Sequence, residues 1–374
     1  MKKAILFFLL FALHVTPYTL HVVHAQEAGL QKQELGKTHP REAMYYRRLA
    51  EGSVQCQLCP RNCPIPPGGT GFCRVRENVK GTLYTNAFSN PTAVHIDPIE
   101  KKPFFHFLPA TASFSIATAG CNLRCLFCQN WEISQKSPKE TYNFFLTPEA
   151  AAGLAKKAEC ASVAYTYSEP TNFYEYMLAC AIEVKKLGLK NVYHSCGYIN
   201  EKPLKELVKY LDAANIDLKG FSEDYYKEMS SASLAPVLET LKALKKNGVW
   251  VEITNLVIPT KNDDPEMIKE MCAWVVKNLG PDVPIHFSRF YPQYQLKNLP
   301  PTPVEALEKA VEIARSQGVL YCYIGNVPGH PAEDSYCHNC GKLLIDRFGY
   351  QISANNIVNG RCKYCKAQIP GVWK

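Results

Sequence analysis

The sequence lacks a long apolar run, a block of like charge and a low-complexity tract. Its longest apolar stretch, residues 4–13, is about half of the roughly 20 residues that a transmembrane helix needs. No more than two Lys or Arg stand side by side, and the net charge of +8 is spread over 374 residues. These absences exclude a polytopic membrane protein and a disordered chain, and no nucleic-acid partner is expected. Apolar residues make up 47%, enough to bury a large core.

Cysteine, by contrast, is abundant: the chain has 16, in a length too great to need disulfides for stability. Closely spaced cysteines favour metal binding over disulfides, because thiolates on one turn converge on one ion. Most fall into three tight groups: Cys56, Cys59, Cys63 and Cys73; Cys121, Cys125 and Cys128; Cys337, Cys340, Cys362 and Cys365. The others lie alone in apolar segments and are interpreted as buried free thiols: Cys160, Cys180, Cys196, Cys272 and Cys322.

The first 25 residues have the pattern of a secretory signal. Lys2 and Lys3 precede the apolar run, and Ala25 offers a small residue for cleavage. The alternatives are an uncleaved anchor and a wrongly assigned start codon. The segment therefore favours export or membrane anchoring.

A regular alternation of strand and helix patterns begins near residue 113. Apolar, β-rich runs predict strands at 114–118, 162–167, 191–195, 214–218, 249–257, 285–289 and 319–324. Amphipathic helical patterns lie between most of them, which predicts a parallel sheet with right-handed crossovers. Thr147 before Pro148 predicts one helix start, and Thr302 with Glu305 predicts a capping box at another.

The expected fold is therefore α/β: a partial (β/α)6 barrel with two cysteine-rich additions. The barrel is assigned to residues 113–330, the N-terminal four-cysteine element to 43–112 and a zinc-ribbon-like tail to 331–374. In the barrel, Glu252 and Asn255 cannot both face inward on a regular strand, and neither can His286 and Arg289. Polar residues near strand ends of such a fold more often serve a site than the core.

The strand expected at 114–118 runs directly into a loop with the spacing C-x3-C-x2-C, formed by Cys121, Cys125 and Cys128. Three thiolates on one loop can hold three irons of a [4Fe–4S] cube, which leaves the fourth iron open to a small chelating molecule. A structural zinc whose fourth ligand is not in view is the alternative.

This loop, with Phe127 just before the third cysteine, resembles that of the radical S-adenosylmethionine (SAM) enzymes. The flanking sequence from Asp97 to Trp131 is similar to that of the radical-SAM member of the AmmeMemoRadiSam set. This branch is in turn similar to pyruvate formate-lyase activating enzymes. The resemblance covers about residues 43–374. It implies a radical-SAM barrel, a [4Fe–4S] cluster that binds SAM, and reductive cleavage of SAM followed by hydrogen abstraction. It also implies a low-potential electron donor and a functional link to Memo-like and AMMECR-like proteins. The substrate is unknown, and a glycyl residue of a partner protein is one candidate.

The same resemblance assigns four residues to the methionine part of SAM: Glu169, Ser195, Asp217 and Lys219. Glu169 matches the acid of the family's Gly-Gly-Glu-Pro-like motif and is expected to contact the ammonium group; helix capping is its alternative role. Ser195 precedes Cys196, which stands where the family usually has Asn. Asp217 and Lys219 share one face of a strand, and a structural ion pair is the alternative reading of these two.

The two flanking cysteine groups are predicted to bind metal. The C-terminal spacing of two C-x2-C knuckles predicts a structural zinc, with a rubredoxin-like iron or two disulfides as alternatives; the residues are Cys337, Cys340, Cys362 and Cys365. For the N-terminal four, zinc is favoured over a second iron–sulfur cluster, because their spacing differs from that of ferredoxins; the residues are Cys56, Cys59, Cys63 and Cys73.

Two other functions fit parts of the sequence. A non-catalytic scaffold could use the four-cysteine sites to hold partners without cleaving SAM, and an electron-transfer protein would need a fourth ligand at the central loop. The sequence leaves the localisation open. The signal-like segment favours export, whereas iron–sulfur clusters are assembled in the cytoplasm as a rule.

Overall fold

The structure is a computed structural model that describes residues 30–374. The signal-like segment expected at residues 1–25 lies outside the described residues. Between residues 30 and 374, no helix combines the length and the apolar character needed to cross a membrane. The largest sheet in this part of the chain has eight strands, in the order β14-β13-β12-β11-β10-β9-β8-β7.

Every strand predicted for the barrel is present in this sheet. The bounds are β8 Ala112–Ala117, β9 Ser162–Tyr165, β10 Lys190–Ser195, β11 Ala213–Asp217, β12 Trp250–Val257, β13 Ile285–Arg289 and β14 Cys322–Gly325. Each pairs in parallel with its neighbour in the sequence. β7, Ala93–Pro98, pairs with β8 in the antiparallel direction.

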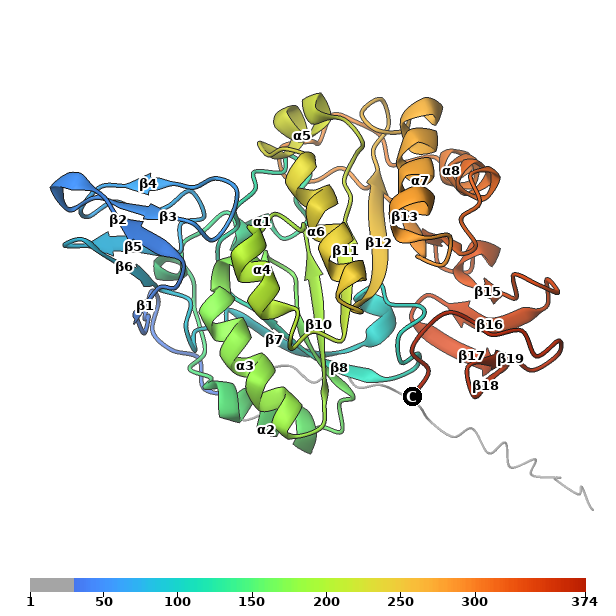
Figure 1. The fold of residues 1–374 in the computed structure, drawn as a ribbon, viewed down its shortest axis with the longest axis horizontal. Helices are drawn as coiled ribbons and strands as arrows, with labels where there is room; N and C mark the ends of the chain where they lie inside the picture. Colours follow the sequence, from blue (N-terminus) through green and yellow to red (C-terminus); the bar gives the residue numbers. More distant parts are fainter. Residues whose placement is uncertain (1–29) are drawn as a thin grey trace, which may run out of the picture.

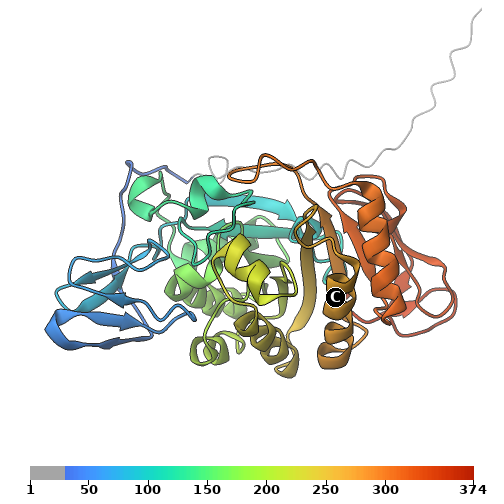
Figure 2. The same ribbon diagram turned by 90° about the horizontal axis from the view of Figure 1, so that it is seen from above.

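Helices connect the parallel strands and lie along one side of the curved sheet (Figures 1 and 2). Their bounds are α2 Pro148–Lys157, α3 Tyr174–Lys186, α4 Glu201–Leu207, α5 Glu223–Ser230, α6 Ala235–Lys246, α7 Pro265–Leu279 and α8 Val304–Ser316. The short α1, Trp131–Ser134, precedes them. This arrangement confirms the predicted partial (β/α)6 barrel.

One predicted helix start is confirmed and the other is wrong. Thr147 caps α2, since its side chain accepts from the amide of Ala150. The capping box at Thr302 is absent: α8 begins at Val304, and its N-cap residue is Pro303, with no side-chain cap. The Thr302 hydroxyl instead donates to the carbonyl of Val257 over 2.6 Å. The hydroxyl is therefore used to join two segments of the barrel.

The interior of the barrel is filled by a segment that follows β7, residues 103–108, which we call the plug. Phe104 and Phe107 are fully buried and pack against small inward residues of β9, β10 and β11: Ala164, Val192 and Ala213. The plug is also fixed by its backbone. The carboxylate of Glu252 on β12 accepts from the amides of Phe105 and His106, over 3.0 and 2.9 Å. Small strand residues thus leave room that the plug occupies.

Two small β-rich elements flank the barrel at opposite ends (Figure 1). The N-terminal one has the sheets β1-β6-β5 and β2-β3-β4. Its strands are β1 Arg41–Glu42, β2 Tyr46–Arg48, β3 Val54–Cys56, β4 Pro64–Ile65, β5 Arg76–Val79 and β6 Thr82–Thr85. The C-terminal one has β15 Ser335–Tyr336, β16 Leu343–Phe348, β17 Gln351–Asn355, β18 Ile357–Val358 and β19 Arg361–Cys362.

The C-terminal element is docked on the plug. Arg347 of β16 is 4% exposed and donates to the carbonyl of Phe105 over 2.9 Å. Its guanidinium also lies 4.2 Å from the centre of the Phe105 ring. The backbone of Val372 exchanges hydrogen bonds with the plug, donating to His106 and accepting from Leu108. These contacts join the C-terminal element to the barrel interior.

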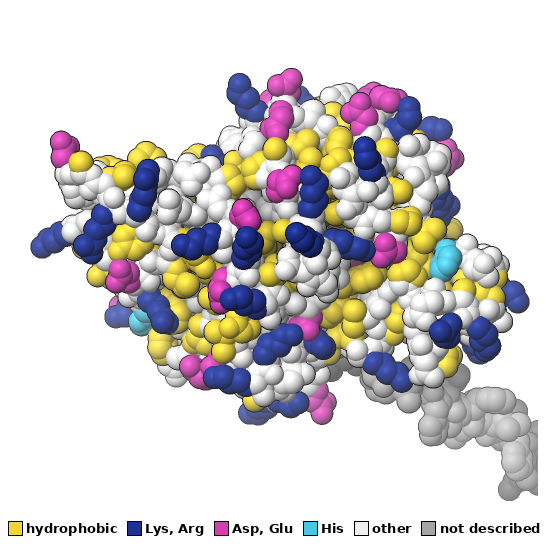
Figure 3. Space-filling model, viewed as in Figure 1, with side chains coloured by type: hydrophobic (Ala, Val, Ile, Leu, Met, Phe, Trp, Pro, Cys, Tyr) yellow, Lys and Arg dark blue, Asp and Glu magenta, His cyan; other side chains and the backbone are white. Residues whose placement is uncertain are grey.

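The molecular face in Figure 3 carries a mixture of charges, with Lys and Arg scattered among Asp and Glu and apolar side chains between them. Several exposed charges of the described residues pair along a helix, for example Lys205 with Glu201 and Lys242 with Glu239. Exposed pairs of this kind contribute little to stability.

We expect Phe104→Ala to lower the free energy of unfolding by about 3–5 kcal/mol, because it leaves a cavity where the plug meets three strands. The matched control is Phe348→Ala, since Phe348 is 67% exposed, and its effect should stay within about 0.5 kcal/mol. Chemical denaturation of both variants measures the difference. Similar stabilities would show that the plug adds little to the core.

Candidate functional site

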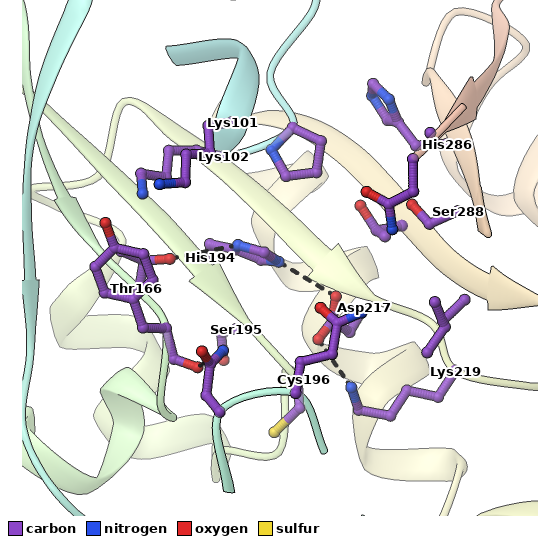
Figure 4. Close-up of a pocket in the computed structure, with 18 of the residues that line it drawn as sticks. Lys101, Lys102, Thr166, His194, Ser195, Cys196, Asp217, Lys219, His286 and Ser288 are labelled. Atoms are coloured by element: carbon purple, nitrogen blue, oxygen red, sulfur yellow. Dashed lines mark hydrogen bonds and ion pairs between the residues drawn. The ribbon is translucent and has the colours of Figure 1, made fainter. Parts of the chain in front are cut away.

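A cavity of about 490 Å³ opens where the parallel strands end. Its wall comes from the carboxyl ends of successive strands and the loops that follow them, the usual place for a site in such a sheet. From the central loop it takes Cys121, Cys125 and Cys128, and from the ends of β9 and β10 and the loops that follow them it takes Thr166, Glu169, Ser195 and Cys196. From β11 onward it takes Asp217, Lys219, Thr254, His286 and Ser288 (Figure 4). All seven residues that the sequence assigned to the cluster and SAM therefore line one cavity.

The central loop joins β8 to α1 and presents its three thiols to this cavity. Each sulfur has a polar neighbour: the Leu123 amide donates to Cys121, and the hydroxyls of Ser230 and Ser134 lie 3.3 and 3.1 Å from the sulfurs of Cys125 and Cys128. Hydrogen bonds of this kind tune the potential of an iron–sulfur cluster.

The loop also packs against its surroundings through its backbone. The amides of Arg124 and Leu126 donate to the carbonyls of Ser230 and Met229, at the end of α5, over 2.9 and 3.0 Å. Burial raises the pKa of both Cys121 and Cys125. Buried thiols become thiolates only beside a positive charge, and a bound metal supplies that charge because it lowers the pKa of its thiol ligands. The donor set and its burial therefore fit a metal cluster.

Glu169 is both a cap and a wall residue. Its carboxylate is 2% exposed and accepts four hydrogen bonds: from the amide and hydroxyl of Thr171, from the Ser195 hydroxyl and from the Cys196 amide, over 2.6–3.0 Å. The bond to the Thr171 amide caps η4, Pro170–Phe173, so the capping alternative is confirmed. The Ser195 hydroxyl donates to the Glu169 carboxylate and so helps to hold it in place. Contact of either residue with SAM stays a prediction.

Asp217 and Lys219 lie on one face, as predicted, and form an ion pair of 2.8 Å (Figure 4). The other carboxylate oxygen of Asp217 lies 3.2 Å from Nε2 of His194. Burial opposes both charges, but each partner stabilises the other. The pKa of Asp217 is therefore lowered and that of Lys219 raised. The ion-pair alternative is thus confirmed as geometry, while both side chains still face the cavity.

A second charge group in the wall was not assigned from the sequence. Asp97, at the end of β7, is buried and accepts from Lys101 over 2.8 Å, from Lys102 over 2.6 Å and from the hydroxyl of Tyr167. Burial lowers the pKa of Lys102 to about 8, although Asp97 opposes the shift. Asp97, Lys101 and Lys102 lie in the segment that carries the family resemblance. That resemblance was the only indication in the sequence that they belong to a site.

The strand-face argument for β12 and β13 is confirmed. Thr254 lines the cavity next to the inward Glu252, whereas Asn255 is directed to the other face and donates to the carbonyl of Leu218 over 2.7 Å. His286 and Ser288 line the cavity, whereas Arg289 donates to the carbonyl of Thr302 over 2.8 Å. Of the two pairs, only His286 lines the cavity, whereas Glu252 is buried in the barrel interior beside it.

The N-terminal four-cysteine element lies against the central loop. Gly120, with φ +97°, precedes Cys121, and a Cβ there would come within 2.3 Å of Val75 and 2.7 Å of the Cys73 carbonyl. Arg61 donates from Nε to the carbonyl of Asn122 over 2.5 Å, and Arg124 donates to the carbonyl of Phe72. Only glycine permits this close approach.

Three thiols of the N-terminal element, those of Cys56, Cys59 and Cys73, lie close enough to interact, and a buried cation lies beside one of them. Burial raises the pKa of Cys59 to about 12, and the neighbouring Cys56 and Cys73 add to the shift. Arg76, which pairs with Glu175, lies with Nη1 3.5 Å from the Cys56 sulfur. A metal bound by Cys56, Cys59, Cys63 and Cys73 stays a prediction.

The C-terminal cysteines form a set that fits a metal ion. The ligand atoms of Cys337, Cys340, Cys362 and Cys365 all lie within 4.8 Å of one another. The sulfur distances are 3.6 Å for Cys337 and Cys365 and 3.8 Å for Cys340 and Cys362. A tetrahedral zinc with Zn–S bonds of ≈ 2.3 Å places its sulfurs about 3.8 Å apart.

No other set of three or more His, Cys, Asp or Glu between residues 30 and 374 gathers so closely. The three central cysteines are thus more widely spaced than the C-terminal set, as ligands of a cubane cluster must be, because its irons lie at separate corners.

Comparisons with known proteins agree with this geometry. Residues 115–274 match the Radical SAM superfamily. The uncharacterized protein MJ0808 of Methanocaldococcus jannaschii is 46% identical over 331 residues, which cover 88% of this chain and 98% of that protein. The pyruvate formate-lyase-activating enzyme of Listeria monocytogenes is 24% identical over 175 residues, 43% of this chain and 68% of that enzyme.

Among solved structures, a radical SAM methyltransferase from Sphaerobacter thermophilus has a similar fold. Its TM-score is 0.50 at 12% identity, over 84% of this chain and 81% of that chain. At this identity the likeness concerns the fold alone.

We expect Cys362→Ser to lose one zinc per chain and to expose residues 335–362 to protease, because the folding energy of a small metal site comes mainly from the metal. The control is Cys160→Ala, which removes a lone buried thiol outside all three cysteine groups. Metal analysis and limited proteolysis measure both effects. Unchanged zinc content and protection in Cys362→Ser would contradict a metal at this site.

Proposed function

The chain belongs to the radical SAM superfamily and is an enzyme of that class; we propose that it abstracts hydrogen from a glycyl residue of a partner protein, as an activating enzyme. A [4Fe–4S] cluster with bound SAM supplies one-electron cleavage of the SAM sulfonium and hydrogen abstraction from a substrate. The observation that carries the assignment is the meeting of the three loop thiols with Glu169, Ser195, Asp217 and Lys219 in one cavity. The similarity to activating enzymes supports the choice of substrate.

In this proposal the chain's own residues hold the cluster and SAM. Cys121, Cys125 and Cys128 would hold the cluster, with serine hydroxyls and loop amides beside their sulfurs. Glu169 would hold a positively charged amino group, since its carboxylate is fixed by four donors and faces the cavity.

Charge and solvent are controlled by neighbouring residues. Lys219 would balance a carboxylate or the cluster's negative charge, because it lies among Asp217, Cys125 and Cys196. Phe127 and Leu123 line the same cavity and would keep water away from the loop.

The wider setting is also part of the proposal. A low-potential donor would supply the electron, and Memo-like and AMMECR-like proteins are the proposed functional associates of the AmmeMemoRadiSam branch. A segment of the partner protein would enter the cavity where it opens at the ends of the parallel strands.

We expect Cys125→Ala to lose the cluster and SAM cleavage, because two thiolates remain on the loop. The control is Cys272→Ala, whose thiol is fully buried in α7 and does not line the cavity. Iron and sulfide content, visible absorbance and anaerobic release of 5′-deoxyadenosine after reduction measure both variants. Full iron content with SAM cleavage in Cys125→Ala would disprove the ligand assignment, and no cleavage by the wild type would favour the scaffold or electron-transfer alternative.

Glu169→Gln should weaken SAM binding about tenfold or more, since a charged hydrogen bond contributes about 1.5–3 kcal/mol. It should also lower stability by about 1–3 kcal/mol, because the amide NH2 group faces donors that now meet a carboxylate. The control is Thr171→Val, which removes a donor to Glu169 but keeps the negative charge. Equal SAM affinity of Glu169→Gln and Thr171→Val, each measured anaerobically, would return Glu169 to a purely structural role.

A further inference from the structure

A protein that delivers an electron to the cluster has to bind outside the cavity. The cavity is about 490 Å³, too small to admit a folded protein, and the three loop cysteines line it. On its other side the loop contacts the N-terminal element, where Gly120 approaches Val75 and Cys73 (Figure 1). Electron transfer slows steeply with distance, so the outer surface nearest the loop is the favoured entry point. The N-terminal element forms part of that surface.

Three arginines gather where the N-terminal element meets the loop. The guanidinium carbons of Arg61 and Arg124 lie 3.5 and 4.0 Å from the centre of the Phe72 ring. Arg74, which follows Cys73, is close enough for its charge to act on Arg124. All three arginines and Phe72 are partly exposed. We call this group, Arg61, Arg74 and Arg124 around Phe72, the arginine patch.

The arginine patch has no compensating carboxylate among the residues 30–374. Arg61 and Arg124 donate only to backbone carbonyls, those of Asn122, Ser231, Cys121, Leu123 and Phe72. The side chain of Arg74 has no hydrogen bond or ion pair with a described residue. Burial lowers the pKa of Arg124, and the charges of Arg74 and Arg61 add to the shift, whereas Cys121 and Cys73 oppose it. The patch therefore keeps an excess of positive charge.

Arg74 stands at a backbone position that favours a different residue. Its φ is +65°, a left-handed conformation that glycine adopts freely and other residues rarely. Its amide donates to the carbonyl of Gly71 over 2.8 Å, so the backbone itself closes the turn. The Arg74 side chain therefore contributes a charge to the surface and nothing to the turn.

A surface of this composition fits an acidic partner. Arginine and aromatic side chains are enriched at the centres of protein interfaces, and opposite charges speed association. The excess of positive charge would repel a basic protein. An acidic protein would be steered to the part of this chain that lies against the cysteine loop.

We propose that the arginine patch is the docking site of the electron donor, an acidic protein that carries a low-potential, one-electron redox group. One electron passes from this group to the [4Fe–4S] cluster. The donor is oxidised by one electron, the cluster is reduced from the 2+ to the 1+ state, and no bond forms or breaks. The inference rests on the cluster of the proposed function and not on its glycyl substrate, so either can fail alone.

The test uses reduced flavodoxin, a small acidic flavoprotein, with the anaerobic holoenzyme and SAM. Stopped-flow absorbance measures flavodoxin oxidation at about 0.01 M and 0.15 M salt, where charges act over about 30 and 8 Å. We expect the wild-type rate constant to fall with salt. At low salt Arg74→Gly should be about fivefold slower and Arg74→Glu about tenfold slower, because surface charges of an interface act mainly on association. Calorimetry with oxidised flavodoxin should show the same order of affinities.

Lys80→Gly is the matched control. Lys80 is an exposed cation of the same element with a φ of +53° and no partner among the described residues. It follows β5, whereas Val75, which contacts the loop, precedes that strand. Its removal should change the rate constant less than about twofold. Both glycine variants should be at least as stable as the wild type, because glycine relieves the left-handed conformation, and Arg74→Lys should keep the wild-type rate.

Photoreduction with 5-deazariboflavin separates docking from an effect on the cluster itself. This small neutral reductant needs no charged docking surface, so it should reduce the wild type and all variants at the same rate. The reduction potential of the cluster should also stay the same. A shifted potential that accounts for the slower reaction of Arg74→Glu would mean that the arginines only offset the charge of the thiolates, which would overturn the docking site.

Two further results would overturn it: equal rates of flavodoxin oxidation by the wild type and Arg74→Glu, or an equal loss of rate in Arg74→Gly and Lys80→Gly. A wild type that 5-deazariboflavin reduces but flavodoxin does not rejects the docking site alone. A wild type that neither donor reduces rejects the cluster of the proposed function as well.

Discussion

The buried carboxylate of Glu252 is the interaction on which the rest of the structure depends. It accepts two amides of the plug, one indole N–H and the ring of His286, so it joins β12, β13 and the barrel interior at one point. The plug in turn carries the C-terminal element through Phe105 and Arg347. An ionised carboxylate without these donors would be very costly at this depth, and this cost makes the arrangement specific.

The site follows from this framework and from a second support on the other side. The parallel strands bring the cysteine loop and the polar residues of later strands to one edge of the sheet, while the N-terminal element fixes the loop from outside through Arg61 and the close approach at Gly120. The loop is therefore held between the barrel and the N-terminal element, and this support fixes the positions of its three thiols.

Local patterns were enough to predict the barrel strands, the Thr147 cap and the three cysteine groups, because each depends on neighbouring residues. Other features depend on distant partners. Thr302 has the residues of a capping box, but Phe290 and Val257 occupy its hydroxyl. The plug and β7 lie within residues 43–112, which were assigned to the N-terminal element, yet β7 pairs with β8 of the barrel sheet. Nothing near Arg74 in the sequence indicates that its charge acts on Arg124 of the central loop.

The docking of the C-terminal element on the plug has a consequence for the order of events at the ribosome. The ring of His106 bonds to the carbonyl of Pro370, which is 264 residues further along the chain. At about 5–20 residues per second, roughly 13 to 50 seconds pass between the synthesis of these two residues. During this time the barrel can assemble around the plug, but the plug still lacks its contacts with the C-terminal element. The candidate cavity is therefore completed late in biosynthesis, well after the loop of cysteines has been made.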